Sequence, residues 1–160
     1  MKEKETIGGK TRRRTFLKST GAAMIGGTLA YNMGMVNEAF GAPSSNTLKV
    51  GLIGCGGRGT GAAAQALRAD PDVVLTAMGD VFADRLEGSL KALREEIDEK
   101  KIRVNPENRF VGFDAYKKVI NSGVDVVLLA TPPSFRPDHM TAAIDAGKHV
   151  FSEKPVAVDA

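Results

Sequence analysis

Short apolar runs alternate with amphipathic stretches from residue 48 onward. Runs at 48–53, 73–78, 124–130 and 149–152, with a weaker one at 109–111, predict β-strands. The stretches between them, at 59–69, 82–97, 115–120 and 137–146, have the composition or the apolar spacing of helices. Because 124–130 is nearly all apolar, it is typical of a strand covered on both faces. We therefore predict a Rossmann-type, doubly wound parallel α/β sheet.

The turn after the first predicted strand has the spacing G-x-G-x-x-G and opens the first predicted helix. Gly54 suits the tight turn, Gly56 lets the backbone approach a pyrophosphate, and Gly59 allows close packing of helix on strand. A tight turn without a ligand is the alternative, but a strand, a turn, a helix and a later acidic residue together favour a dinucleotide. The predicted cofactor-binding residues of this turn are Gly54, Cys55, Gly56, Gly57, Arg58 and Gly59.

Asp80 follows the second strand and is placed to accept hydrogen bonds from a ribose diol. A carboxylate there repels a 2′-phosphate, so NAD is favoured over NADP. Arg85 leaves NADP possible, although a helical arginine more often pairs with a neighbouring acid. S-adenosylmethionine usually requires an acidic residue at the end of the first strand, where this chain has Leu52 and Ile53.

Charge and cysteine content exclude several classes of protein. Residues 1–18 hold seven Lys and Arg against two Glu, whereas residues 19–160 hold 15 against 17 acidic residues, so nucleic-acid binding has little support. Cys55 is the one cysteine of the sequence, which excludes an intramolecular disulfide and a thiolate zinc cluster; no metal site is predicted. The apolar runs after the N-terminal segment are far shorter than the ~20 residues that cross a bilayer.

The N-terminal segment has the order of an export signal. RRTFLK at 13–18 is similar to the twin-arginine consensus, a mildly apolar stretch follows at 21–31, and Ala39 and Gly41 suit a signal peptidase. We expect a signal peptide and cleavage region at 1–41, a linker at 42–47, a partner in the twin-arginine machinery, and a periplasmic protein. A basic tail or surface helix is the alternative. The lipobox-like stretch that ends at Cys55 is rejected, because cleavage there would remove a strand.

Motifs spread over residues 48–160 resemble the glucose–fructose oxidoreductase/inositol dehydrogenase (Gfo/Idh/MocA) family. They are the turn at 54–59, Asp80, the tripeptide Ala130-Thr131-Pro132, His139, the sequence AGKHV at 146–150 and the sequence EKP at 153–155. The resemblance implies that Lys154 is catalytic, lying toward the nicotinamide as a general acid/base. A buried lysine there can have a lowered pKa, which suits proton transfer.

The resemblance also assigns further residues of the cofactor site. Glu153 is expected to contact the ribose region, Thr131 and Pro132 to line the cleft, and the peptide bond before Pro155 to be cis. Many family members have Asn where this chain has Pro133, which leaves that contact open. His139 is about as easily a packing residue as a functional one, and His149 is interpreted as structural.

The sequence thus predicts an exported NAD(P)-dependent oxidoreductase that transfers hydride between nicotinamide and a sugar or polyol carbon. An NAD-dependent glycosidase of the same family and a dinucleotide-binding protein without catalysis are the alternatives. Family members continue past the EKP motif into a second α/β domain with the substrate site and much of the oligomer interface. We therefore expect the domain at 48–160 to be truncated at its C-terminal end, the 160 residues alone to be inactive and poorly soluble, and homo-oligomers only for the full-length form.

Overall fold

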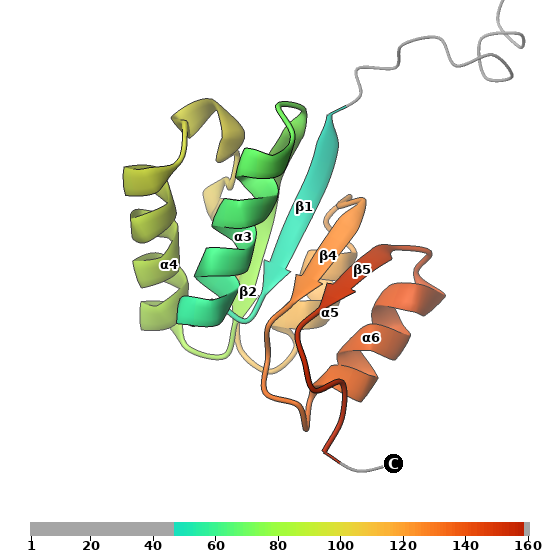
Figure 1. The fold of residues 1–160 in the computed structure, drawn as a ribbon. Helices are drawn as coiled ribbons and strands as arrows, with labels where there is room; N and C mark the ends of the chain where they lie inside the picture. The colour runs from blue at the N-terminus through green and yellow to red at the C-terminus, as the bar shows by residue number, and fades with distance from the viewer. Residues whose placement is uncertain (1–46, 159–160) are drawn as a thin grey trace, which may run out of the picture. The chain divides into compact units, whose positions relative to one another are not determined.

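One parallel sheet organises the computed structural model, which describes residues 47–158 (Figure 1). Its strands are β1 (Leu48–Ile53), β2 (Val73–Asp80), β3 (Arg109–Val111), β4 (Val126–Leu129) and β5 (His149–Ser152). They lie in the order β3-β2-β1-β4-β5, and every neighbouring pair is parallel. This arrangement confirms the Rossmann-type α/β fold expected from the sequence.

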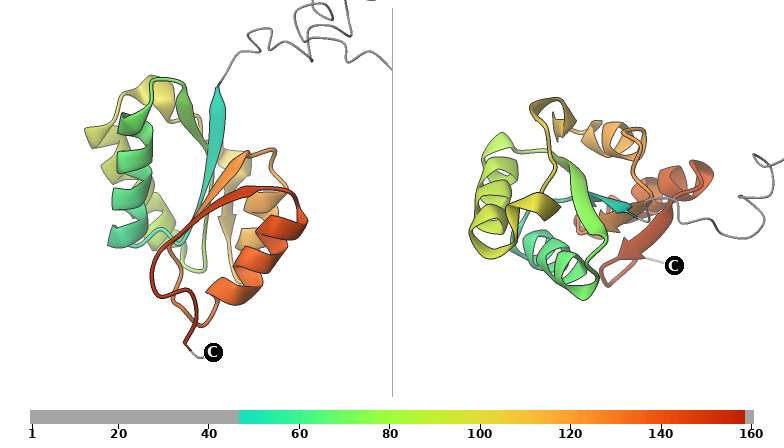
Figure 2. Two further views of the ribbon diagram at one scale, coloured as in Figure 1. Left: turned by 45° about the vertical axis from the view of Figure 1, so that its right-hand side comes forward. Right: turned by 90° about the horizontal axis from the view of Figure 1, so that it is seen from above.

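Helices cover both faces of the sheet, as Figure 2 shows. They are α3 (Gly57–Ala69), α4 (Ala83–Glu96), α5 (Ala115–Ile120) and α6 (Arg136–Asp145), with single 3₁₀ turns at Glu99–Lys101 and Pro106–Asn108. The pair α3 and α4 packs on one face, and the pair α5 and α6 packs on the other. Within residues 47–158, no helix combines the length and the apolar character needed to cross a membrane.

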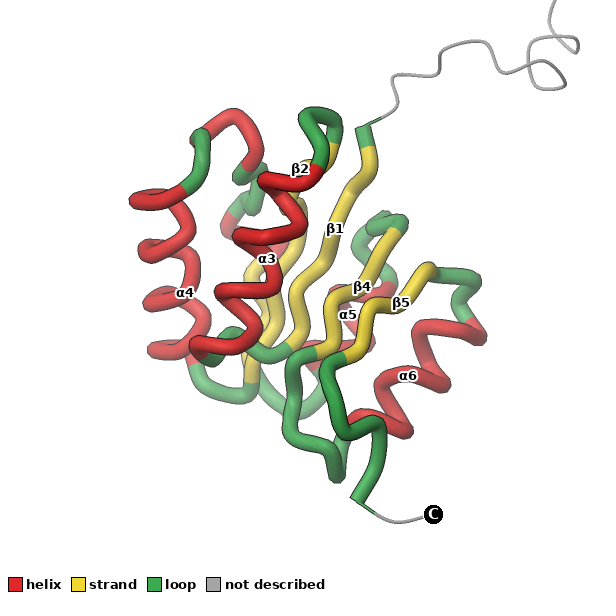
Figure 3. The backbone as a smooth tube through the Cα atoms, in the orientation of Figure 1, coloured by secondary structure: helices red, strands yellow, loops and turns green. Residues whose placement is uncertain are grey.

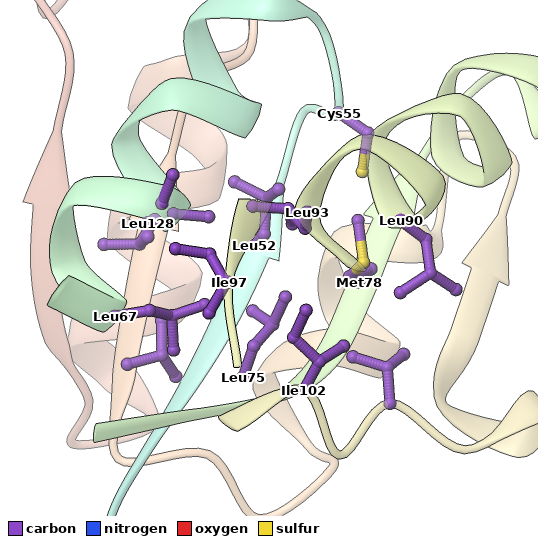
Figure 4. Close-up of a cluster of buried hydrophobic side chains, with 14 of the residues drawn as sticks. Leu52, Cys55, Leu67, Leu75, Met78, Leu90, Leu93, Ile97, Ile102 and Leu128 are labelled. Atoms are coloured by element: carbon purple, nitrogen blue, oxygen red, sulfur yellow. The ribbon is translucent and has the colours of Figure 1, made fainter. Parts of the chain in front are cut away.

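The hydrophobic core has two layers, one on each side of the sheet. The layer under α3 and α4 is the larger, and the side chains labelled in Figure 4 belong to it: Leu52, Cys55, Leu67, Leu75, Met78, Leu90, Leu93, Ile97, Ile102 and Leu128. The second layer joins the opposite face of the strands to α5 and α6 through Ile53, Ala77, Val119, Ile120, Val124, Val127, Leu129 and Ala143. Alternate residues of β1 and β4 therefore serve opposite layers, because successive strand side chains point to opposite faces.

The carboxyl ends of the strands bring the sequence motifs together. In Figure 3 the loops that follow β1, β4 and β5 lie at the same edge of the sheet. The strand order reverses between β1 and β4, and such a reversal is where open α/β sheets bind ligands.

Several element boundaries differ from the sequence prediction, and α4 and α6 are each displaced by one residue at their ends. Helix α3 begins at Gly57 instead of residue 59, and β2 continues to Asp80. Strand β4 spans only Val126–Leu129, and Val124, which precedes it, is buried in the second core layer. The longer β2 makes Asp80 a strand residue whose backbone is fixed by the sheet.

Candidate functional site

The glycine turn joins β1 to α3 with no room for side chains at two of its positions. Gly54 has a φ of +93°, and a Cβ on it would lie 2.8 Å from the backbone of Ala130 and Thr131. A Cβ on Gly59 would lie 1.9 Å from the carbonyl oxygen of Gly54. Real Cβ atoms do not approach so closely, so these two glycines set the spacing between helix, strand and the loop after β4.

The other side of the same turn is open. A Cβ on Gly56 would meet nothing nearer than the Arg85 guanidinium at 3.7 Å, and Gly57 has no neighbour within 4 Å in that direction. The first turn of α3 has no acidic residue and no side-chain cap, so its N–H groups are not satisfied by side chains. Such a helix start, with space above it, fits the pyrophosphate of a dinucleotide.

Asp80 fastens the glycine turn to the end of β2. Its Oδ2 accepts a hydrogen bond from the Cys55 N–H at 2.6 Å, and its Oδ1 accepts one from the Phe82 N–H at 2.9 Å. A carboxylate has about four lone-pair positions, so both oxygens can accept further donors such as ribose hydroxyls. The structure thus brings Asp80 to the turn; its contact with a ribose stays a prediction.

Cys55 is a packing residue of the turn. Its side chain is buried, and its Sγ lies 3.5 Å from the carbonyl oxygen of Gly79. Burial, with a smaller effect from the nearby Asp80 charge, raises the pKa of the Cys55 thiol to about 12. The thiolate is therefore scarce near neutral pH, which agrees with a small filler and not with a nucleophile.

A cleft of about 570 Å³ lies beside the turn, between the ends of β2 and β4. Asp80, Phe82 and Arg85 line one side, and Thr131, Pro132 and Phe135 line another. The two loop residues predicted to line a cofactor cleft, Thr131 and Pro132, are thus in the wall of one. That this cleft holds the adenosine half of a dinucleotide stays a prediction, which the presence of Asp80 in the lining favours.

Aromatic rings form the wall that α5 and α6 contribute to the cleft. The Tyr116 and His139 rings stack with centroids 4.0 Å apart, and Phe113 lies 6.5 Å from Phe135. His139 Nδ1 is 3.3 Å from Thr131 Oγ1, and partial burial lowers the pKa of His139, which keeps the ring neutral at pH 7. Sequence reasoning missed Phe113, Tyr116 and Phe135, because nothing in their spacing marks them as neighbours.

Arg85 differs from its sequence interpretation as a partner of a neighbouring acid. Among residues 47–158 it takes part in no ion pair. Its guanidinium carbon lies 5.7 Å from the centre of the Phe82 ring, and the side chain borders Gly56. An arginine so placed is available to an anionic ligand of the turn.

The segment after β5 reaches the same edge of the sheet. Glu153 continues the strand pairing with an N–H to the Leu129 carbonyl, and the Lys154–Pro155 bond is cis, as the resemblance implied. The Glu153 carboxylate is buried, with Oε1 2.7 Å from Nη2 of the exposed Arg58. Lys154 is exposed and does not line the cleft, which corrects the expectation of a buried lysine; its catalytic role stays a prediction.

Arg136 is a site residue that the sequence did not reveal. It is only 5% exposed although it opens α6. Its Nε donates to the Thr131 carbonyl at 2.7 Å, and its Nη1 donates to the Glu153 carbonyl at 2.5 Å and to the Pro155 carbonyl. The loop after β4 and the segment after β5 are therefore joined through one side chain.

A parallel sheet with a glycine turn after β1, a carboxylate ending β2 and a cleft at the strand-order reversal defines a dinucleotide-binding Rossmann domain. Residues 48–160 match the model of the oxidoreductase family with an NAD-binding Rossmann fold, GFO_IDH_MocA. The chain belongs to the Gfo/Idh/MocA family, and its nucleotide-binding part is the NAD-binding Rossmann fold of that family.

Individual relatives agree with this family. The chain is 33% identical over 114 residues to a glycosyl hydrolase family 109 protein of Streptomyces coelicolor, covering 71% of this chain and 23% of that protein. It is 29% identical over 112 residues to a myo-inositol 2-dehydrogenase of Thermotoga maritima, covering 70% and 29%. The solved scyllo-inositol dehydrogenase of Lactobacillus casei, with NAD(H) and scyllo-inositol bound, superposes with a TM-score of 0.56 at 26% identity, covering 71% and 29%.

The chain spans less than a third of the length of these three proteins. What they share with it is the nucleotide-binding part. Family membership and the NAD-binding fold are therefore shared properties, while the reaction of the whole protein requires a proposal.

Proposed function

We propose that the protein transfers hydride between the nicotinamide of NAD and a hydroxyl-bearing carbon of a polyol or sugar. The observation that carries the proposal is that the open glycine turn, Asp80 and the Glu153–Pro155 segment meet at one edge of the sheet. NAD, when bound, supplies the hydride acceptor. The inositol dehydrogenases among the relatives support a polyol substrate.

Each group at the site has a definite task in this proposal. The N–H groups that start α3 bind the pyrophosphate, and Asp80 accepts from the adenosine ribose while it holds the turn through the Cys55 N–H. Lys154 would accept the proton of the substrate hydroxyl as the hydroxyl-bearing carbon gives up a hydride to the bound cofactor and becomes a carbonyl. Glu153 lies beside Lys154 and is turned toward Arg58.

Cofactor binding is the first test. Titration of the protein with NADH, followed by the enhancement of nicotinamide fluorescence, should give a saturable Kd, and NADPH should bind more weakly. Gly56→Val places a branched side chain where the pyrophosphate is expected and should abolish binding, while Gly88→Val, at an exposed position of α4 with no neighbour within 4 Å, is the matched control. Binding that survives Gly56→Val would refute this site.

The reaction is tested with a panel of polyols and sugars. With the full-length form we expect NADH formation at 340 nm with a cyclic polyol. Lys154→Met should lower its kcat by at least about 100-fold, with little change in the NADH Kd. Equal loss of kcat and NADH binding would contradict a role confined to proton transfer.

A glycosidase is the second candidate, and the relatives named glycosyl hydrolase family 109 favour it. In that reaction a sugar is oxidised transiently and NAD is regenerated within the turnover, so there is no net NADH. Release of nitrophenol from a nitrophenyl glycoside, dependent on NAD but without a change at 340 nm, would select it. A protein that binds NADH and does neither would be a binding protein without catalysis.

Export by the twin-arginine route is part of the proposal, and its signal at 13–18 lies outside the described residues. Free NAD should be scarce outside the cytoplasm, so the proposal requires a cofactor that stays bound. Protein purified from the periplasm should retain nicotinamide absorbance after dialysis, and a mature chain should begin near Ala42. A lack of either result contradicts export with a resident cofactor.

A further inference from the structure

Arg136 is unusual in being a buried cation without a carboxylate partner. Among the arginines of the part of the chain that the structure describes, Arg136 is the one that is buried, at 5% exposure. It takes part in no ion pair there. Its donors go to three backbone carbonyl groups, those of Thr131, Glu153 and Pro155. Removing a charge from water is unfavourable, so these contacts must offset the desolvation of the guanidinium.

The position of Arg136 in α6 does not account for its presence. It is the first residue of the helix, where the helix dipole disfavours a cation. Pro137 and Asp138 supply the residue types that suit a helix start, a proline in the first turn and an acid near the positive end. The start of the helix therefore does not depend on the guanidinium, whose hydrogen bonds go to other segments of the chain.

Those contacts bracket Lys154. The Glu153 and Pro155 carbonyls immediately precede and follow the lysine in sequence, and both accept from Nη1 of Arg136. The third acceptor, the Thr131 carbonyl, belongs to the wall of the cofactor cleft. One planar side chain therefore fixes the backbone of Lys154 relative to that wall.

We propose that Arg136 is a positioning residue that holds Lys154 in register with the bound cofactor. The inference rests on the proposed function, in which Lys154 handles the substrate proton. The Lys154 side chain is exposed and can rotate, so the direction in which its amine reaches depends on the backbone that Arg136 holds. Reacting groups require placement within about 0.5 Å, which a rigid guanidinium fork achieves better than the flexible ammonium of lysine.

The experiment compares Arg136→Met, Arg136→Lys and the control Arg68→Met with the wild type. Arg68 is an exposed arginine paired with Glu96 on the surface, so its loss should leave the site intact. Without cofactor, hydrogen exchange measured by mass spectrometry should speed up by about tenfold in the peptide covering 149–158 in Arg136→Met, with the β1 and β2 peptides unchanged. Arg136→Lys should be intermediate, and Arg68→Met should match the wild type.

The second measurement follows the reaction of Lys154 with an amine reagent, with Lys91 on the exposed face of α4 as the internal reference. Saturating NADH should slow labelling of Lys154 by about fivefold or more in the wild type and in Arg68→Met. In Arg136→Met the protection should fall below about twofold, while the NADH Kd changes by less than about threefold. Partial recovery in Arg136→Lys separates positioning from general loss of structure.

Each outcome decides the proposal. Full protection of Lys154 in Arg136→Met overturns it, and so does a loss of protection that comes with faster exchange in every peptide. If Arg136→Met does not fold, wild-type protection in a folded Arg136→Lys overturns it, and reduced protection supports it. If the wild type binds no NADH, the proposed function fails, and the exchange data decide alone: loosening confined to 149–158 supports a fixing role, and unchanged exchange overturns it.

Discussion

The contact between Gly59 and Gly54 makes a sharp prediction for the substitution Gly59→Ala. The added Cβ would lie 1.9 Å from the Gly54 carbonyl oxygen, whereas real Cβ atoms stay beyond about 3 Å. Both atoms that meet are backbone or fixed to it, so no rotamer relieves the clash. Helix α3 must move away from β1 by about 1 Å, which also disturbs the turn on which the pyrophosphate is expected to lie.

The size of the effect follows from overpacking. Forcing a methyl group into a filled position costs about 1–3 kcal/mol, and a backbone clash this short belongs at the upper end, about 3 kcal/mol. At roughly 4 °C per kcal/mol for a domain of this size, Tm should fall by about 12 °C. The NADH Kd should rise by at least about tenfold, since a 1 Å displacement of a binding group has effects of this order.

Gly61→Ala is the matched control, two residues along the same helix. Its Cβ would meet nothing within 4 Å, so alanine only improves helix propensity and should stabilise the protein by about 0.5–1 kcal/mol. Thermal unfolding followed by circular dichroism and NADH fluorescence titration measure both variants. Equal Tm values for Gly59→Ala and Gly61→Ala would refute the close packing of α3 on β1 as the origin of the effect.

Three further predictions concern titratable groups. Asp80→Asn should weaken NADH binding by about tenfold, because the amide has one oxygen acceptor fewer for the Cys55 and Phe82 N–H groups. It should also reduce the preference for NADH over NADPH, since an amide does not repel a 2′-phosphate. An unchanged ratio of the NADH and NADPH Kd values in fluorescence titrations would contradict this. Burial raises the pKa of Cys55 to about 12 in the folded protein, so the free energy of unfolding should fall as the pH rises from the ordinary thiol value of 9.0 toward 12. The urea midpoint of Cys55→Ala should fall less over this range. Parallel curves of urea midpoint against pH for the two proteins would contradict this. Burial lowers the pKa of His139, so its contribution to stability is present above the usual value of 6.5 and is lost as the pH falls below that value. His139→Phe should therefore flatten the decline of the urea midpoint between about pH 7.5 and 5.5. An equally steep decline in the variant would count against this.

Local patterns were sufficient for the sheet and the turn. The largely buried strands β2 and β4 are visible as apolar runs, and Gly54 and Gly59 occupy places where backbone approaches backbone. The position of Asp80 at the end of β2 followed from its place after the second run, whereas its hydrogen bond from the Cys55 N–H was not predicted.

The contacts of Arg136 could not be predicted in this way. An arginine next to a proline at a helix start has the pattern of a surface charge, and two of its three acceptors lie 17 and 19 residues away in sequence. The aromatic wall is similar, because Tyr116 and His139 come from different helices. These side chains come into contact only after α5 and α6 have packed on the sheet, so the periodicity within either segment does not predict the contact.

The ion pair between Arg58 and Glu153 links the glycine turn to the segment that carries Lys154. Arg58 belongs to the turn where a pyrophosphate would bring negative charge, and Glu153 is buried beside the lysine. A phosphate that draws the guanidinium toward itself leaves a desolvated carboxylate without its counter-charge. If nucleotide binding favours the broken ion pair, thermodynamic linkage requires the converse. Breaking the pair then raises the nucleotide affinity by the same factor by which the nucleotide shifts the equilibrium between the paired and the unpaired state.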